Sequence, residues 1–272
     1  MKKILILYFS GVGATKRIAE IIYTQLLRNL EVDPPSKIDI FSIEKLKNEI
    51  NLENYDALIV GTPTYHAAPS KVVMSYFDSV PQLAEKMPAF IYNTRGLCSL
   101  NTNRILAKQL HKKNILTIMD RAYRSPASDG SIIAPFVKRF FEFEKNIDEK
   151  ISIDCAFFLE LLELPEKNIT QSHIPRFKFG SIINAPNKLV GQLITIKIHL
   201  HKSKCIKCGQ CIETCPHAAL SRDKDNYPLF IPKSCENCYR CIHHCKSMAL
   251  SLSKRKTLKT SLRYSDYLND GS

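Results

Sequence analysis

The chain reads CIKCGQCIETC at residues 205–215 and CENCYRCIHHC at residues 235–245, two copies of one motif that decide the fold of its C-terminal part. Each copy spaces its cysteines C-x2-C-x2-C-x3-C, and the two copies together use eight of the ten cysteines. Three closely spaced cysteines can hold three corners of an iron–sulfur cube, while the fourth is directed to the other cube. The repeat therefore predicts two 4Fe–4S clusters with crossed ligands.

The crossing gives two expected ligand sets. They are Cys205, Cys208, Cys211 and Cys245 for the first cluster, and Cys235, Cys238, Cys241 and Cys215 for the second. A segment this short buries little apolar surface, so the clusters are expected to staple it together. Structural zinc is disfavoured because successive two-residue spacings are not its common ligand arrangement. Disulfides are disfavoured in a cytosolic protein, and the other two thiols, Cys98 and Cys155, are expected to be passive.

Residues from about 200 to 252 resemble a bacterial-type two-cluster ferredoxin, including the proline that follows the fourth cysteine, Pro216. In the second copy Lys246 takes that place, so the two halves are chemically unequal. The histidines His217, His243 and His244 are expected to be surface or supporting side chains and not ligands. Which half faces the rest of the protein is left open.

Roughly the first 125 residues alternate apolar runs with helix-like segments, which is typical of parallel βαβ units. Strands are expected at residues 4–9, 38–41, 57–60, 89–92 and 115–118. Most of these runs are continuously apolar, as in strands covered on both faces. A first helix is predicted from the spacing of Thr15, Ala19, Ile22 and Leu26, and a long last helix is predicted to begin near Pro135.

The first strand runs into a short loop that precedes the first helix. A glycine-containing turn at a helix N-terminus binds anions. Lys16 occupies the third glycine position of a dinucleotide fingerprint, and the loop is too short for a Walker A motif, so a single terminal phosphate and hence FMN is favoured. The loop resembles the flavodoxin phosphate loop, in which Val12 replaces a common Thr and removes one hydrogen bond of ~0.5–1.5 kcal/mol. Its expected cofactor-binding residues are Ser10, Gly11, Val12, Gly13, Ala14 and Thr15.

Two later loops follow the third and fourth expected strands, where a flavodoxin-like sheet binds its flavin. The resemblance implies that they border the isoalloxazine, with Tyr65 stacked on the ring and His66 at its edge. The residues concerned are Pro63, Thr64, Tyr65, His66, Asn93, Thr94, Arg95 and Gly96, with Arg121, Arg124 and Ser125 as weaker candidates.

The predicted fold class is α/β, a flavodoxin-like doubly wound five-stranded parallel sheet followed by a small α+β ferredoxin-like domain with two 4Fe–4S clusters. The expected divisions are 1–165 for the FMN-binding domain, 166–195 for a linker or packed excursion, 196–225 and 226–255 for the two cluster halves, and 256–272 for a tail.

The chain has a formal charge of +13, and anionic cofactors would reduce it to about +7. Because much of the basicity then compensates the cofactors, nucleic-acid binding is disfavoured. No apolar run approaches the roughly 20 residues of a membrane helix, and a cytoplasmic protein without a membrane partner is expected.

The whole arrangement resembles fused flavodoxin–ferredoxin proteins, found mainly in anaerobes. That resemblance implies an electron carrier that links FMN and two 4Fe–4S clusters to redox partner proteins. One alternative is a flavoenzyme that reduces a small substrate at FMN with electrons from the clusters. Another is a docking module with structural clusters, whose basic surface includes Lys202, Lys204, Lys207, Lys254, Arg255 and Lys256.

Overall fold

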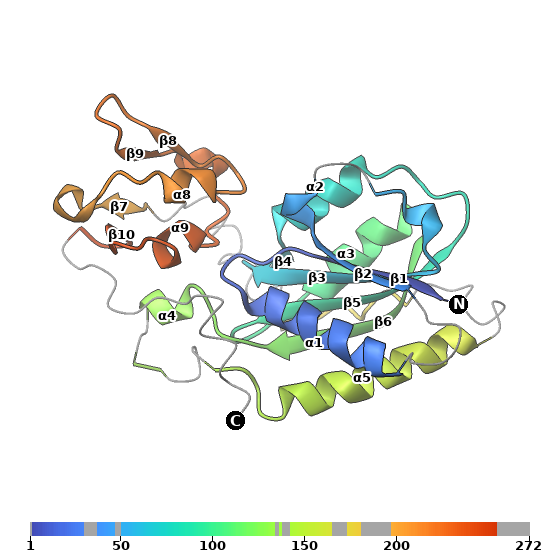
Figure 1. Cartoon of the computed structure of the whole chain (residues 1–272). Helices are drawn as coiled ribbons and strands as arrows, with labels where there is room; N and C mark the ends of the chain where they lie inside the picture. Colours follow the sequence, from blue (N-terminus) through green and yellow to red (C-terminus); the bar gives the residue numbers. More distant parts are fainter. Residues whose placement is uncertain are drawn as a thin grey trace.

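The computed structural model describes residues 2–29, 37–46, 50–133, 136–137, 142–164, 173–180 and 197–254. A parallel sheet covered by helices forms the larger part, and the cysteine-rich residues form a smaller module at one end of it (Figure 1). In these residues no helix is both long and apolar enough to cross a membrane.

The five expected strands are all present and run parallel in the order β2-β1-β3-β5-β6. Their bounds are β1 (Lys3–Tyr8), β2 (Lys37–Ser42), β3 (Ala57–Tyr65), β5 (Met87–Arg95) and β6 (Ile115–Arg124). A short strand, β4 (Ala68–Pro69), turns back antiparallel along the end of β3. This order is the flavodoxin-like doubly wound order, so the predicted fold class is confirmed.

Helices cover both faces of the sheet. Helices α1 (Ala14–Asn29) and α5 (Ile147–Glu163) pack on the face that carries Ile4 and Ile6 of β1. Helices α2 (Lys71–Ser79) and α3 (Thr102–His111) pack on the opposite face, with Leu5 and Leu7. Successive strand residues point to opposite faces, so a strand buried on both sides must be apolar throughout.

Pro135 lies outside the described residues, but residues 136–137 and 142–146 are not helical and the last helix of this part begins at Ile147, so the prediction of one long helix from near Pro135 is wrong. The preceding residues 142–144 run beside the end of β6, where the Arg124 guanidinium donates to the carbonyls of Glu142 and Phe143, both at 3.1 Å. The Glu144 amide donates back to the Arg124 carbonyl at 3.2 Å. These long-range hydrogen bonds occupy backbone groups that a helix would need.

The cysteine-rich module repeats one small unit twice. Each motif copy contributes a single helical turn, α8 (Gln210–Glu213) or α9 (Arg240–His243), next to a short antiparallel strand pair. The strand pairs are β7 (His199–Leu200) with β10 (Leu250–Ser251), and β8 (Leu220–Arg222) with β9 (Pro228–Phe230). Its core is small and includes Ile198, Leu220, Ile242 and Leu250, and this agrees with the predicted α+β unit.

Short helical turns complete the described chain. They are η1 (Ile43–Lys45), η2 (Leu52–Asn54), α4 (Gly130–Ile133), η5 (Lys202–Lys204) and η6 (Pro232–Ser234). Most of the expected linker and all of the expected tail lie outside the described residues. The described residues 173–180 lie against the sheet domain, where the His173 amide donates to the Thr117 carbonyl at 2.7 Å and the Lys178 amide to Asn101 Oδ1 at 2.9 Å.

Candidate flavin and iron–sulfur sites

The eight motif cysteines lie in two separate cavities of the module. One cavity is lined by Cys205, Cys208, Cys211 and Cys245, and the other by Cys215, Cys235, Cys238 and Cys241. Each cavity thus holds three cysteines of one motif copy and the fourth cysteine of the other copy. These are the two groups expected from crossed ligation.

Burial makes the isolated thiolates unfavourable in both cavities. It raises the pKa of Cys211 to about 11, with further raising by the neighbouring Cys245, Cys205 and Cys208. It raises the pKa of Cys241 well above its usual value, with further raising by Cys238, Cys235 and Cys215. Four thiolates can share such a cavity only beside a compensating positive charge, which the irons of a cluster supply.

Backbone amides point at sulfur atoms at equivalent places in the two copies. The amides of Ala219 and Ala249 donate to the sulfurs of Cys215 and Cys245, both at 3.2 Å. Hydrogen bonds to sulfur stabilise the anionic ligand and tune a cluster. In the described part of the chain, no three His, Cys, Asp or Glu side chains converge on a position for a single metal ion. A cube differs, because each of its corners takes one thiolate, and the two four-cysteine cavities fit that requirement.

A third cavity, of about 570 Å³ including space open to solvent, lies at the carboxyl ends of β1, β3 and β5. Twelve of the fourteen residues expected to contact FMN line it. They are Ser10, Gly11, Val12, Ala14, Thr15, Pro63, Thr64, Tyr65, His66, Thr94, Arg95 and Gly96.

The two remaining residues lie behind the wall of this flavin pocket. Gly13 has a φ of 122°, which favours glycine, and its amide donates to Ser10 Oγ at 3.1 Å to shape the loop. Asn93 is buried, accepts from Thr64 Oγ1 at 3.0 Å and donates to Asn103 Oδ1 at 2.7 Å. Asn93, which lies in β5 and not in the expected loop, therefore fixes the end of β3 from beneath the pocket.

The loop after β1 has the geometry of an anion site. The carbonyls of Ser10 and Gly11 accept hydrogen bonds from Arg240, so the amides that follow them in the planar trans peptides point away from Arg240. These amides stand at the start of α1, whose dipole favours negative charge. A Cβ on Gly11 would lie 2.1 Å from Tyr65 Oη, so the loop can approach Tyr65 only with glycine there. The loop therefore fits the phosphate of FMN.

The turn between β3 and β4 brings His66 to the pocket. His66 and Ala67 form a two-residue hairpin turn, and both have left-handed backbones, with φ of 48° and 62°. Burial lowers the pKa of His66, although Asp129 and Glu236 oppose the shift. Burial also raises the pKa of Tyr65, with further raising by Cys238, so Tyr65 stays a neutral phenol beside the pocket.

Sequence reasoning missed part of the pocket wall. Residues 126–129, after β6, line it together with Ser125, which was a weaker candidate. The side chains of the other two weaker candidates bind outside the pocket. Arg121 forms an ion pair with Asp154, and Arg124 donates hydrogen bonds to the carbonyls of residues 142–143. In the sequence, only the position of residues 126–129 after an expected strand could have indicated that they line the pocket.

Two residues of the cysteine-rich module, Asn237 and Tyr239, also line the flavin pocket. They flank Cys238, which is 7% exposed. Asn237 Nδ2 lies 3.3 Å from His66 Nε2, which joins the module to the β3–β4 turn. The second cysteine group is therefore the one beside the flavin pocket.

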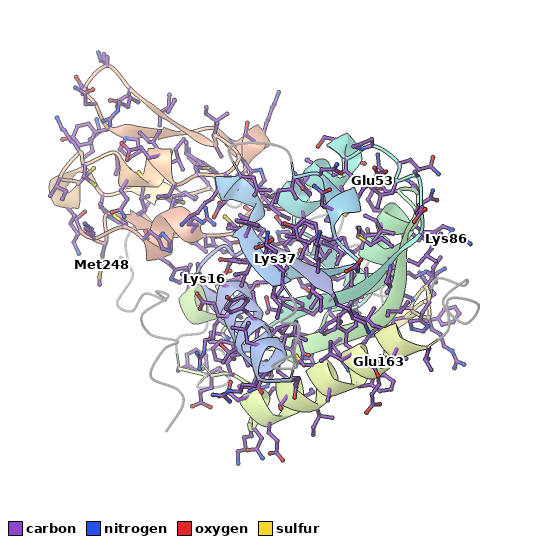
Figure 2. All side chains as sticks on the ribbon, turned by 45° about the vertical axis from the view of Figure 1, so that its right-hand side comes forward. Lys16, Lys37, Glu53, Lys86, Glu163 and Met248 are labelled. Carbon is purple, nitrogen blue, oxygen red and sulfur yellow. The ribbon has the colours of Figure 1, made fainter. Side chains whose placement is uncertain are left out.

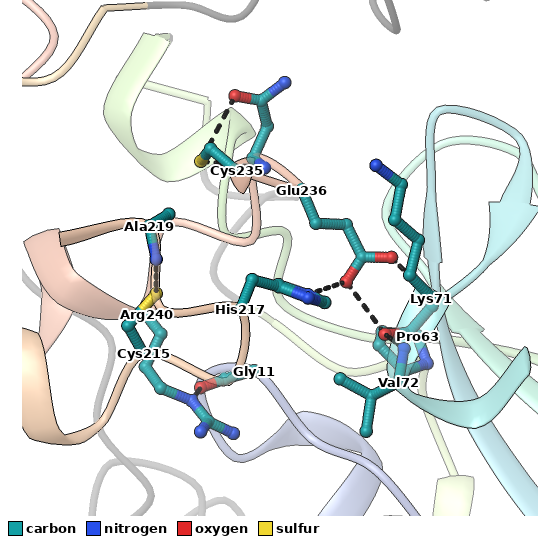
Figure 3. A network of polar contacts seen from close by, with 12 residues as sticks. Gly11, Pro63, Lys71, Val72, Cys215, His217, Ala219, Cys235, Glu236 and Arg240 are labelled. Carbon is teal, nitrogen blue, oxygen red and sulfur yellow. Dashed lines mark hydrogen bonds and ion pairs between the residues drawn. The ribbon is translucent and has the colours of Figure 1, made fainter. Parts of the chain in front are cut away.

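Arg240 fastens the module to the phosphate loop. Its Nε donates to the Gly11 carbonyl at 2.7 Å (Figure 3). Its Nη2 donates to the Ser10 carbonyl. The guanidinium also forms a two-pronged ion pair with the Glu44 carboxylate and lies 5.1 Å from the centre of the Phe9 ring. Its side chain is only 8% exposed. Such a planar, bidentate contact requires arginine.

Glu236 makes a second fastening, at the N-terminus of α2. Its carboxylate accepts from Ser70 Oγ at 2.8 Å and from the Lys71 amide, and His217 Nε2 lies 2.8 Å away (Figure 3). A carboxylate at a helix N-terminus is stabilised by the helix dipole. His243 adds a third contact, its Nε2 lying 2.8 Å from the Ser128 carbonyl. His217 and His243 thus support the arrangement, in agreement with their expected role.

Comparison with known proteins agrees with this geometry. A family model described as a flavodoxin domain matches residues 5–119, and one described as a 4Fe–4S dicluster domain matches residues 204–249. The chain therefore contains a flavodoxin domain at its N-terminal end and a 4Fe–4S dicluster domain at its C-terminal end, an arrangement similar to that of fused flavodoxin–ferredoxin proteins. The first domain implies FMN, and the second implies two 4Fe–4S clusters.

Individual proteins resemble one domain or the other. The pyruvate synthase subunit PorD of Pyrococcus horikoshii is 32% identical over 73 residues, which span 25% of this chain and 66% of that subunit. An oxidised flavodoxin from Bacillus cereus is 17% identical, with a TM-score of 0.43 over 60% of this chain and 99% of its own. A WrbA-like flavodoxin from Agrobacterium tumefaciens is 18% identical, with a TM-score of 0.44 over 60% of this chain and 98% of its own. The fold assignment itself rests on the strand order and the family model.

Proposed function

We propose that the protein passes electrons between FMN and two 4Fe–4S clusters, and from there to redox partner proteins. The observation that carries this proposal is that Asn237 and Tyr239, on either side of Cys238, form part of the flavin pocket wall. FMN supplies exchange of two electrons in single steps, and each cluster supplies exchange of one. The chain would thus link two-electron and one-electron partners.

The residues of the pocket have separable tasks in this proposal. The amides of the loop at residues 10–15 would bind the phosphate, and Tyr65 and His66 would border the ring. Asn237 and Tyr239 would close the pocket on the side of the module and limit water there. Arg240 and Glu236 would keep the module in register with the pocket, since both bind groups of the flavodoxin domain.

The exposure of the ligands supports an order for the two clusters. Cys238 and Cys241 are buried, and Cys238 lies between two residues of the flavin pocket wall, whereas Cys208 is exposed. The second cluster, held by Cys235, Cys238, Cys241 and Cys215, would therefore exchange electrons with the flavin. The first cluster, held by Cys205, Cys208, Cys211 and Cys245, would exchange them with partners. On the same basis we propose residues 1–165 as the FMN-binding domain and 196–225 and 226–255 as the two cluster halves.

The flavoenzyme alternative is less favoured by the pocket wall. A small substrate must reach the flavin ring, and the module residues Asn237 and Tyr239 occupy one side of the pocket. A defined substrate whose reduction is lost on replacing His66, while FMN remains bound, would favour the enzyme.

The proposal is tested by cofactor analysis followed by reductive titration. Protein purified without oxygen should contain about eight irons and one FMN per chain. Light-driven reduction of the flavin should then be followed by reduction of the clusters in the same molecule, at a rate independent of protein concentration. Four irons, no flavin, or no exchange between the flavin and the clusters would refute the proposal.

A further inference from the structure

We propose that the protein docks acidic redox partners on a basic surface beside the first cluster, which deepens the proposed function and rests on it. This cluster-1 surface is defined by Lys202, Lys204, Ile206, Lys207 and Cys208, all of which are exposed. The internal repeat, the chemistry of the surface and its charge each support it.

In the second motif copy, the residues equivalent to this part of the cluster-1 surface form a docking corner within the chain. Residues 236–240 are all buried, and they hold the module against the flavodoxin domain and the flavin pocket. The equivalent residues of the first copy begin with Ile206, which is 65% exposed where Glu236 is 6% exposed. In the second copy this docking corner is therefore covered by the rest of the chain, whereas residues 206–208 of the first copy face outward.

The outward corner has an apolar centre. Ile206 lies between the ligands Cys205 and Cys208 of one cavity and lines that cavity as well as the surface. A large exposed apolar side chain with charged neighbours is typical of protein interaction sites. A partner that covers Ile206 would stand next to the most exposed cysteine of the first cluster.

The corner is also charged in a way that favours anions. The ammonium groups of Lys202 and Lys207 both lie over the Tyr227 ring, at 4.9 and 4.3 Å from its centre. The same ring attracts both cations, so it gathers two positive charges around one side chain at this corner. An acidic group that approaches the corner would be attracted by both.

Residues 197–225 carry six Lys and Arg against three Asp and Glu, so the acids of this half do not cancel the lysines. The Asp223 carboxylate accepts from the amides of Asp225 and Tyr227, at 2.9 and 2.8 Å, and so serves the β8–β9 turn. Over residues 197–254 there are ten Lys and Arg and four Asp and Glu. Two bound clusters bring about −2 each and leave the module near +2, so the positive potential is concentrated at the exposed lysines. A protein partner with carboxylates around an apolar spot fits both features.

The test uses one acceptor in two charge forms, native cytochrome c, which is basic, and the same protein succinylated on its lysines, which is acidic. The holoprotein is reduced with dithionite, and the excess is removed. It is then mixed with either form in stopped flow. In each event one electron leaves the reduced iron–sulfur module and converts one ferric haem to ferrous. We expect the acidic form to be reduced about tenfold faster, and salt to remove most of the difference.

The matched variants change equal charge at two places. K202E/K204E/K207E alters the cluster-1 surface, and K86E/K108E/K145E alters exposed lysines of the flavodoxin domain, of which Lys86 lies far from the module (Figure 2). The first variant should slow the acidic acceptor about tenfold and speed the native one. A mere shift of cluster potential would change both acceptors in one direction. I206A should slow both acceptors and leave the salt dependence as in wild type.

Three outcomes would overturn the inference. The first is equal rates of reduction for the two acceptors, and the second is an equal loss of rate in both triple variants. The third is that no lysine change slows the reduction of the acidic acceptor. Salt-dependent binding of a 20-base-pair DNA duplex to the same lysines, without preference for the acidic acceptor, would assign the surface to nucleic acid instead. Flavin-to-cluster exchange is measured in the same samples. If that exchange is present and the acceptor preference is absent, the docking inference alone fails.

Discussion

Replacing Arg240 by Ala should detach the cluster module from the flavin pocket while leaving both clusters in place. The Arg240 side chain is 8% exposed, and it binds the Glu44 carboxylate and the carbonyls of Ser10, Gly11 and Thr214. Removing one partner of a buried ion pair costs about 3–5 kcal/mol. The Glu44 side chain is 21% exposed and can be hydrated again, so we use the lower end of this range of cost.

A loss of about 3 kcal/mol lowers the docking equilibrium constant about 150-fold. The module remains tethered by the chain, so the effect is a shift from docked to undocked molecules. Hydrogen exchange of the α9 amides should speed up. The rate of cluster reduction after a light pulse that reduces the flavin should fall in proportion to the docked fraction.

The repeat supplies a matched control, because Gln210 holds the position of Arg240 in the first motif copy. Q210A should leave both measurements as in wild type. Iron content near eight per chain shows that each variant keeps its clusters. The reasoning is refuted if R240A leaves α9 exchange and flavin-to-cluster transfer unchanged, or if Q210A loses as much. A double-mutant cycle with E44Q then isolates the ion pair.

Three further outcomes are expected. V12T should tighten FMN binding about 2- to 10-fold in a titration of the flavin-free protein, because it adds one hydroxyl to the phosphate loop. Unchanged affinity would show that position 12 does not face the phosphate. A67G should stabilise the protein by about 0.5–1 kcal/mol in urea unfolding, because φ at Ala67 is 62°, whereas the strand control A68G should destabilise it. In the folded holoprotein, iodoacetamide should alkylate Cys98, which is exposed, and spare Cys155, whose pKa burial raises to about 12; equal labelling would contradict the buried position of Cys155.

Local patterns were sufficient for the strands and for the cysteine groups. Four of the five parallel strands contain a continuous apolar run, because both of their faces are buried. The edge strand β2 is partly exposed and carries polar residues between its apolar ones. The cysteine spacing predicts which thiols share a cavity, because a cube admits only short connections between its corners. In both cases the deciding contacts lie within a few residues or follow from the repeat.

Local patterns failed where distant groups competed. The residues before Ile147 have helical spacing, yet Arg124 binds their carbonyls and draws them along β6. Asn93 was expected in a pocket loop, yet it lies in β5 and its side chain turns inward to Asn103. The sequence did not indicate the role of Arg240, because an arginine on the surface and a buried arginine that joins two domains look alike until the partner is placed.

The sequence by itself determined that this chain pairs a flavodoxin-like sheet with two iron–sulfur sites, because ligand spacing and strand burial are written in local residue order. Only the tertiary structure decided which half of the repeat faces the flavin pocket. That choice depends on Glu236, Asn237 and Arg240 meeting groups more than 160 residues away, and the same corner of the first copy is left outward. A repeat makes two equivalent surfaces, and long-range hydrogen bonds and ion pairs select between them.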